Sequence, residues 1–469
     1  MARATACILM SLLLAGCTGA NIGDDRRDPT PGSRLPLAVD FPDIGKIDFA
    51  PPMRLGFSST GVEPAVAAAH GNDLYVVAMD QLFRSRDAGQ SWSPLGRPAC
   101  YAGAPACLGM ERWDAGVRSN ADGGDLAIGP DGRLHFVSLM CSDQCYRSWT
   151  DYYESSDGGD TWTGALTISP SQGPAYTDSP DRPWITLDDA GNVYALWRNV
   201  SDVVYLRVRN GVTNAWAEPS VVGTAVRAGP PIVEADGQRL IIPIQGDNVS
   251  LAKSDDAGKT WTFFDVPEPT DRFKVGVITG GMDVRGSMGI AWAEDPNASA
   301  TAALDGIMEP SVFLAVTDDR GVTWTGTRQI SPIGHTAVLP WLAVRPDGAY
   351  VAVWYGKEQG GTVADPQGEW RPFAALGHLS DRGTPRVVPL SDQPTHVGAI
   401  CAKGALCLAA CEAVVDAACV RVEDRNLLDY FEAGFTADGF PLVAFGADSE
   451  DPALRRMGAD VWVTVGTTG

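Results

Sequence analysis

Seven stretches of the chain share one pattern of hydrophobic positions, in which two apolar runs flank a short turn that contains glycine. Apolar residues that alternate around Asp-Gly-type turns are typical of a β-hairpin with one strongly buried face. The fifth stretch is the weakest, because Ser287, Met288 and Gly289 stand where a strand should begin. We therefore predict seven inner hairpins of an all-β fold, at residues 65–78, 126–138, 184–197, 232–244, 282–292, 341–354 and 432–445.

A second repeat is the octet Ser/Thr-x-Asp-x-Gly-x-x-Trp, which occurs at 85–92, 155–162, 254–261 and 317–324. It describes a tight loop in which the hydroxyl and carboxylate bond nearby backbone amides, and glycine adopts a conformation that is costly for other residues. The tryptophan is expected to fold back into the apolar core. We expect the aspartates to be structural and not catalytic. The defining positions are Ser85, Asp87, Gly89, Trp92, Ser155, Asp157, Gly159, Trp162, Ser254, Asp256, Gly258, Trp261, Thr317, Asp319, Gly321 and Trp324.

The two repeats interleave. Octets follow hairpins one, two, four and five, and residues 207–216 look like a degenerate octet after the third. This order favours the four-stranded antiparallel blades of a β-propeller over a sandwich, with each octet in an outer hairpin. Seven units predict seven blades, with six as the alternative. We expect residues 40–56 to close the ring as an outer strand beside residues 458–465.

The octet resembles the Asp box of bacterial sialidases and other BNR-repeat propellers, where it links the two outer strands of a blade away from the active face. Residues 181–197 and 429–448 also resemble exported bacterial proteins often labelled exo-α-sialidase. The chain departs from that group where Leu428 replaces a glycine and residues 445–448 replace a Trp-x-Asp. Because propellers host many functions, the resemblance implies the fold more specifically than the activity.

The resemblance also implies candidate site residues. A sialidase site has three arginines on the substrate carboxylate, a tyrosine nucleophile paired with a glutamate, and an aspartic acid. The corresponding candidates are Arg118, Arg182 and Arg227 as carboxylate ligands, Tyr430 with Glu432 as nucleophile and base, and Asp181 as acid. They come from the residues that precede the inner strands, where Glu63, His335 and Asp429 also lie.

Each candidate has a structural alternative. Any of the arginines can pair with an aspartate at a blade junction. Trp184 can belong to the core between blades, Tyr430 can close the last blade with its ring, and Glu63 would repel a carboxylate substrate.

The first residues resemble a lipoprotein signal peptide. Arg3 is followed by an apolar run to Leu14 that is too short to span a bilayer, and then by Ala15, Gly16 and Cys17. This ending resembles a lipobox, in which Cys17 is lipidated; the alternative is an ordinary cleaved signal with an incidental cysteine. We predict a signal peptide at 1–16, a flexible tether at 17–39 and one propeller domain at 40–469 with a Cys-rich insertion around 395–425. The protein would then be exported and anchored to the bacterial cell envelope.

When Cys7 and Cys17 of the first residues are set aside, eight of the ten cysteines remain, and an even number in an exported chain indicates disulfides. We expect bridges between Cys100 and Cys107 and between Cys141 and Cys145, with the other four pairing among themselves. Zinc is the alternative interpretation of such clusters. The remaining four are Cys401, Cys407, Cys411 and Cys419.

Charge and composition limit the function. The formal net charge of −22 and the lack of clustered basic residues argue against nucleic acid as a partner. No cofactor is expected, although acidic loops such as residues 178–181 offer oxygen ligands for calcium. Three functions stay open for a monomeric protein: binding of a glycan or protein through the propeller face, exo-α-sialidase-type glycoside hydrolysis, and a structural role in the envelope.

Overall fold

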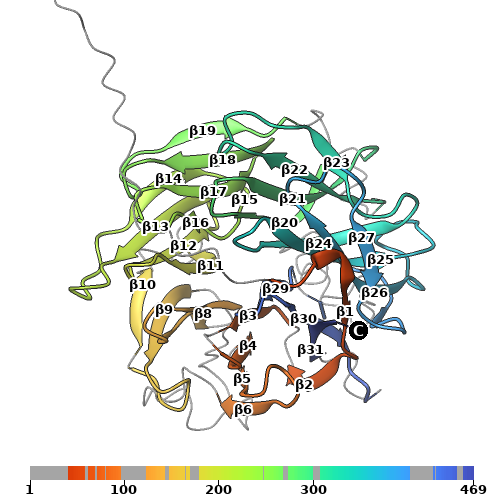
Figure 1. Cartoon of the computed structure of the whole chain (residues 1–469), viewed down its shortest axis with the longest axis horizontal. Coiled ribbons are helices and arrows are strands. Elements are labelled where there is room, and N and C mark those ends of the chain that lie inside the picture. The colour runs from red at the N-terminus through yellow and green to blue at the C-terminus, as the bar shows by residue number, and fades with distance from the viewer. Residues whose placement is uncertain are drawn as a thin grey trace, which may run out of the picture. The chain divides into compact units, whose positions relative to one another are not determined.

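The computed structural model describes residues 41–58, 62–68, 71–79, 81–96, 123–142, 147–163, 165–169, 179–246, 248–267, 273–298, 307–401, 426–427, 429–451 and 458–468. They belong to one compact unit, Phe41–Gly469. No helix in these ranges is long and apolar enough to cross a membrane. The fold is a seven-bladed β-propeller of antiparallel sheets, as the repeats predict (Figure 1).

The first three blades contain four strands each, in chain order from the axis to the rim. Blade one contains β3 (Pro64–Ala68), β4 (Leu74–Ala78), β5 (Gln81–Ser85) and β6 (Ser93–Gly96). Blade two contains β7 (Gly124–Ile128), β8 (Leu134–Ser142), β9 (Arg147–Ser155) and β10 (Leu166–Ser169). Blade three contains β11 (Pro180–Leu187), β12 (Val193–Asn199), β13 (Val203–Arg209) and β14 (Ser220–Thr224).

The next three blades follow the same order, with small variations at the inner and outer edges. Blade four has a divided inner strand and contains β15 (Arg227–Ala228), β16 (Ile232–Val233), β17 (Leu240–Gln245), β18 (Val249–Ser254) and β19 (Thr262–Asp265). Blade five contains β20 (Phe273–Met282), β21 (Met288–Asp295), β22 (Ser311–Thr317) and β23 (Thr327–Gln329). Blade six contains β24 (Thr336–Val344), β25 (Ala349–Lys357), β26 (Glu369–His378), β27 (Arg386–Pro389) and the short β28 (His396–Val397).

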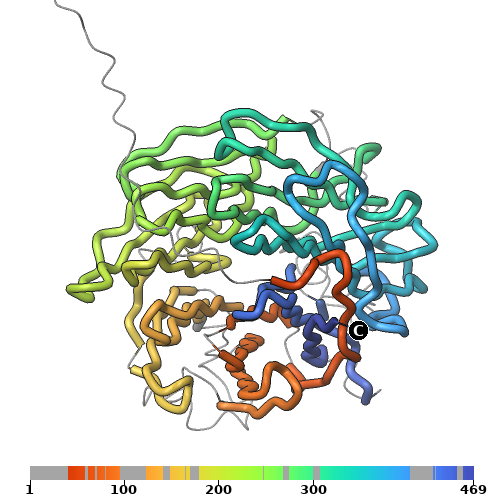
Figure 2. The backbone as a smooth tube through the Cα atoms, viewed as in Figure 1, coloured from red at the N-terminus to blue at the C-terminus, as the bar shows by residue number. Residues whose placement is uncertain are grey.

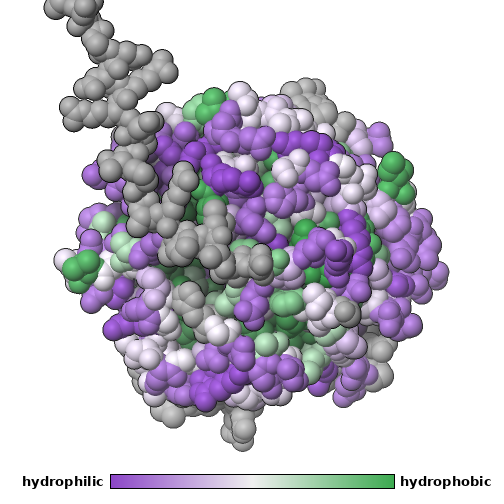
Figure 3. All heavy atoms as spheres, in the orientation of Figure 1, coloured by the Kyte–Doolittle hydropathy of each residue, from purple (hydrophilic) through white to green (hydrophobic). Residues whose placement is uncertain are grey.

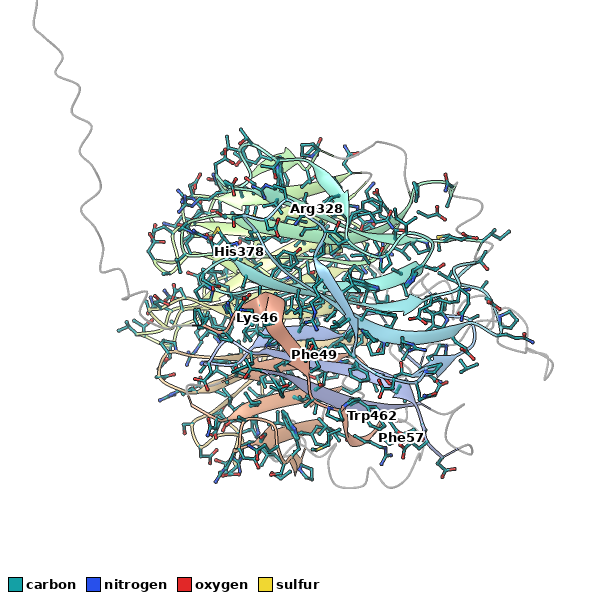
Figure 4. The ribbon with its side chains drawn as sticks, turned by 45° about the vertical axis from the view of Figure 1, so that its right-hand side comes forward. Lys46, Phe49, Phe57, Arg328, His378 and Trp462 are labelled. Carbon is teal, nitrogen blue, oxygen red and sulfur yellow. The ribbon has the colours of Figure 1, made fainter. Side chains whose placement is uncertain are left out.

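The seventh blade closes the ring with the first and last described strands, which lie side by side in Figure 2. It contains β29 (Glu432–Phe435), β30 (Pro441–Asp448) and β31 (Ala459–Thr468). The outer edge of β31 pairs with β1 (Ile47–Phe49), which follows the 3-10 turn η1 (Ile44–Lys46), and with β2 (Met53–Ser58). Phe49, Phe57 and Trp462 mark this blade in Figure 4. The predicted closure by residues 40–56 beside the C-terminal strand is confirmed.

The four octets join the third and fourth strands of blades one, two, four and five, so the prediction of Asp-box hairpins is confirmed. In the first, Ser85 Oγ accepts from Gly89 N at 2.8 Å and donates to Asp87 Oδ1 at 2.8 Å. Asp87 in turn accepts from the amide and hydroxyl of Ser91. The residue before the glycine also has a positive φ, 55° at Ala88, which the sequence pattern did not predict.

The core lies between the faces of neighbouring blades. Its largest fully buried side chains include Trp184, Trp292, Trp354 and Trp370. The Asp-box tryptophans pack in apolar clusters of this core; Trp162 is buried, and Trp92, Trp261 and Trp324 are partly buried. Hydrophilic residues cover most of the face shown in Figure 3. Among the described residues, the apolar core therefore consists of several clusters between the blades.

Candidate functional site

One position recurs on the innermost strands and faces the next blade. In six blades this residue pairs with the residue twelve positions later on the second strand, as Glu432 does with Ala444. The equivalent residues are Ala65, Asp125, Trp184, Thr279, Trp341 and Glu432.

Five of these six side chains form hydrogen bonds to the backbone of the next blade. Glu432 accepts from Val66 N at 3.0 Å, Asp125 from Ile185 N at 2.8 Å, and Thr279 from Leu342 N at 2.9 Å. The indole N–H groups of Trp184 and Trp341 donate to Ala228 O and Ala433 O, at 2.9 and 3.1 Å. This layer is therefore a ring of contacts between blades. The structural alternative for Trp184, a place in the core, matches its contacts.

The candidate site lies at the beginning of the same inner strands, in the layer before this ring. Arg182 stands two residues before Trp184, in a strand irregularity between Asp181 and Trp184. Its φ of 51° is in the left-handed region, which costs about 1–3 kcal/mol for a residue other than glycine. Leu339 has the same geometry before Trp341, with a φ of 55°.

Arg182 belongs to a chain of five alternating charges. Its Nη2 lies 2.7 Å from Asp429 Oδ2, and its Nε lies 3.7 Å from Asp181 Oδ2. Asp181 is also bound by Arg198 at 2.5 Å, and Arg198 contacts Asp202 at 2.6 Å. Burial lowers the pKa of Arg182, but the carboxylates of Asp429 and Asp181 outweigh it and the net shift is upward. Arg182 therefore stays charged in this layer.

Two guanidinium groups have unused hydrogen-bond donors here. Arg182 Nη1 is buried without a hydrogen-bond partner among the described residues. Arg227, at the start of β15, is partly buried, and within the described part of the chain it forms no ion pair. Burial, and then the positive charge of Arg182, lower the pKa of Arg227 to about 10. The two arginines lie on neighbouring inner strands, because Trp184 Nε1 donates to Ala228 O at 2.9 Å, and they can offer their free donors to one anionic group.

Tyr430 is 1% exposed and lies against Trp184 and Trp341, with ring centroids 4.9 and 5.8 Å away. Burial and the negative charges of Glu63, Glu432 and Asp125 raise its pKa well above the ordinary value. An ideal Cβ on Gly123 would lie 2.6 Å from Glu63 Oε2 and 3.5 Å from the Tyr430 hydroxyl. The hydroxyl of Tyr430 and the carboxyl of Glu63 therefore meet at Gly123, although the sequence pattern paired Tyr430 with Glu432.

Two acidic groups near Tyr430, Asp125 and Glu432, are buried and hold their protons more tightly than usual. Burial raises the pKa of Asp125 to about 7, against hydrogen bonds from Ile185 N and Leu126 N. Burial, and then the charge of Asp125, raise the pKa of Glu432 well above its ordinary value. Glu63 is 6% exposed, and its Oε1 accepts from Asp429 N at 3.1 Å. Asp125 and Glu432, the two carboxyl groups of the ring, therefore favour the neutral form.

The structure brings most of the candidates together. Arg182, Arg227 and Tyr430 share one charged cluster with Asp429 and Glu63, while Arg118 lies outside the described residues. Asp181 contacts two arginines, so the structural alternative of an ion pair at a blade junction applies to it and to Arg182. Glu63 and Asp429 also belong to this cluster, although the sequence patterns assigned them no catalytic or binding role. Asp125 lies near Tyr430 as well, and no sequence pattern singled it out. Their signal is only their place before or in an inner strand.

The remaining predictions concern metals and cysteines. Among the residues that the structure describes, no group of three or more His, Cys, Asp or Glu side chains could hold a metal ion. Cys401 is disulfide-bonded. Cys17, Cys100, Cys107, Cys145, Cys407, Cys411 and Cys419, and the side chain of Cys141, lie outside the described part, so the proposed pairings stay predictions.

The protein is thus a seven-bladed propeller, and the charged cluster that contains Arg182, Arg227 and Asp429 lies where its inner strands begin. Among solved structures, the polysaccharide lyase Uly1 has a TM-score of 0.50 and 9% identity, covering 88% of this chain and 91% of that one. A protein of unknown function from Dyadobacter fermentans has a TM-score of 0.46 and 12% identity, over 90% and 100% of the chains. The Penicillium chrysogenum α-L-arabinanase complexed with arabinobiose has a TM-score of 0.46 and 10% identity, over 89% and 98%.

No known family's sequence model matches the chain, and neither does any curated protein. The structural similarity therefore establishes the propeller fold. Membership of the sialidase-like family stays a prediction from the Asp boxes and the stretches around Trp184 and Tyr430.

Proposed function

We propose that this protein is an exported, envelope-anchored propeller that binds an acidic glycan where its inner strands begin. The observation that carries the proposal is Arg227, which lies on the inner strand next to that of Arg182, since Trp184 donates to Ala228 O at 2.9 Å, and has no ion-pair partner among the described residues. Withdrawing an unpaired charge from water costs several kcal/mol. A carboxylate or another anionic group of a ligand would supply the missing partner.

The free donors favour such a ligand. Arg182 uses Nη2 on Asp429, and its buried Nη1 is unpartnered among the described residues. Guanidinium groups bind carboxylates through planar, charge-assisted hydrogen bonds. The fold is shared with a protein named as a polysaccharide lyase, which favours a glycan as the ligand, and the free guanidinium donors favour an acidic one.

Anchoring is a separate part of the proposal. Residues 1–16 would be removed as a signal peptide, and lipid on Cys17 would hold the propeller to the envelope through residues 17–39. Mass spectrometry of the protein purified from membranes would detect the lipid. The Cys17→Ser variant should release the protein from the membrane fraction; an unchanged distribution would contradict the anchor.

Binding is tested with the purified full-length chain and a panel of acidic and neutral oligosaccharides, by isothermal titration calorimetry. We expect the acidic members to bind and Arg227→Met to reduce their affinity at least tenfold. The matched control is Arg285→Met, which removes an exposed arginine that pairs with Asp283. Absence of binding to every acidic member, or equal binding by Arg227→Met, would refute the proposal.

A second function, exo-α-sialidase-type hydrolysis, is favoured by the place of Tyr430 in the same cluster as Arg182 and Glu63. The Asp429 carboxylate on Arg182 argues against it, because it occupies one edge of a predicted substrate ligand. Turnover of a fluorogenic sialoside that is lost in Tyr430→Phe would establish the enzyme. No turnover by the wild-type chain would leave binding as the function.

A further inference from the structure

The arginines of the site differ in how many carboxylates they contact. The inference drawn from this difference rests on the proposed binding function. Arg182 already has Asp429 at 2.7 Å, and Arg198 has Asp181 and Asp202 at 2.5 and 2.6 Å. Within the described residues, Arg227 has no carboxylate at ion-pair distance. One negative charge on a ligand would therefore find two free sets of donors, on Arg227 and on Arg182 Nη1.

A second negative charge on the same group would also be repelled by the carboxylates that the site already contains. Asp429 acts on both arginines, and Glu63 accepts the Asp429 N–H at 3.1 Å while also acting electrostatically on Arg182. Asp429 is 8% and Glu63 6% exposed, so water screens their charges weakly. The carboxylates built into the site thus limit how much negative charge it accepts.

We propose that the Arg182–Arg227 site selects an acid group with a single negative charge, and that Asp429 is the residue that imposes this limit. Sugar carboxylates and sulfate esters meet the condition. A phosphate monoester carries nearly two charges at pH 7.5, because its second pKa is about 6.

Two sugars of the same shape isolate the charge. Glucose 6-sulfate and glucose 6-phosphate differ at pH 7.5 by about one charge on the same position of the same ring. Their affinities are measured by calorimetry with the full-length chain, together with glucuronate and neutral glucose. We expect glucuronate and the sulfate to bind at least tenfold more tightly than the phosphate, and glucose more weakly than either.

Asp429→Asn should bring the affinity for the phosphate to within about threefold of that for the sulfate, because the repelling charge is gone. Asp429→Glu keeps the negative charge and should keep the preference for the sulfate over the phosphate. This variant tests the proposal even if Asp429→Asn folds poorly. The matched control is Asp318→Asn, which removes an exposed carboxylate that pairs with Arg382 on another part of the propeller and should change nothing.

The outcomes separate the two proposals. If neither glucuronate nor the sulfate binds through Arg227, the proposed binding site is wrong. If both bind through Arg227 but the phosphate binds as well, or if Asp429→Asn leaves the discrimination unchanged, only the charge limit is wrong.

Discussion

Glu432 accepts a hydrogen bond from the backbone N–H of Val66 at 3.0 Å, across the junction between the last blade and the first. This junction is where the ring of blades closes, and β1 and β2 hold it from the rim. The other carboxyl oxygen of Glu432, Oε1, is buried and has no hydrogen-bond partner among the described residues. The residue that the sialidase resemblance suggested as a base therefore has a structural contact at the closure.

Replacement of Glu432 should separate its shape from its charge. Glu432→Ala leaves the Val66 N–H unpaired and opens a cavity, so we expect a loss of about 2–4 kcal/mol in the free energy of unfolding. Glu432→Gln keeps an oxygen acceptor of the same size and should stay within about 1 kcal/mol of the wild type. Denaturant unfolding measures both, and equal losses would show that the charge and not the acceptor matters.

The raised pKa values of Asp125 and Glu432 predict that stability decreases as pH rises. The folded protein retains protons that the unfolded chain releases above about pH 4. The contribution is complete below that pH and is lost as pH rises through the folded pKa, about 7 for Asp125. We expect the melting temperature to fall between pH 5 and pH 8. Glu432→Gln has no proton to release there, so its profile should be flatter; parallel profiles would contradict the assignment.

The repeats predicted the blades because their determinants are local. An Asp box fits within eight residues, and each inner hairpin has its turn within one short stretch. The ring of contacts between blades could not be predicted in this way, because one equivalent position is occupied by different residue types. These residues are Glu432, Asp125, Thr279, Trp184 and Trp341. Different side chains perform one task there, and no sequence repeat results.

The site depends on contacts between residues far apart in the chain, which a sequence pattern does not encode. Glu63 accepts a hydrogen bond from the Asp429 amide, although the two residues are 366 positions apart in the sequence. Arg182, which belongs to another blade, also pairs with Asp429. The sequence could place Arg182, Arg227 and Tyr430 before or in inner strands. It could not show that Asp429 would occupy one edge of Arg182.

The stabilisation by the Asp boxes should be lost as pH falls, whereas that by Asp125 and Glu432 is lost as pH rises. Hydrogen bonds from the side chain and then the backbone of Thr161 lower the pKa of Asp157 to about 2. Its stabilisation is present above the unfolded pKa of about 4 and is lost as pH falls through about 2. Asp157→Ala should lower the melting temperature by about 1–3 °C at pH 6, with less effect at pH 2.5. Binding of acidic sugars should not change; a loss of binding would place the box in the functional site.

A methyl group at Gly123 should disturb the site more than its backbone strain alone would. Gly123 has a φ of 88°, and a Cβ there would lie 2.6 Å from Glu63 Oε2, so Gly123→Ala must displace the carboxyl that holds the Asp429 amide. The matched control is Gly71→Ala, because Gly71 has a φ of 89° and nothing within 4 Å of an added Cβ. Both variants should lose about 1 kcal/mol or more of stability from the left-handed backbone. Only Gly123→Ala should also weaken the binding of acidic sugars, by at least threefold in calorimetry. Equal binding by the two variants would show that the position of Glu63 is irrelevant to the ligand.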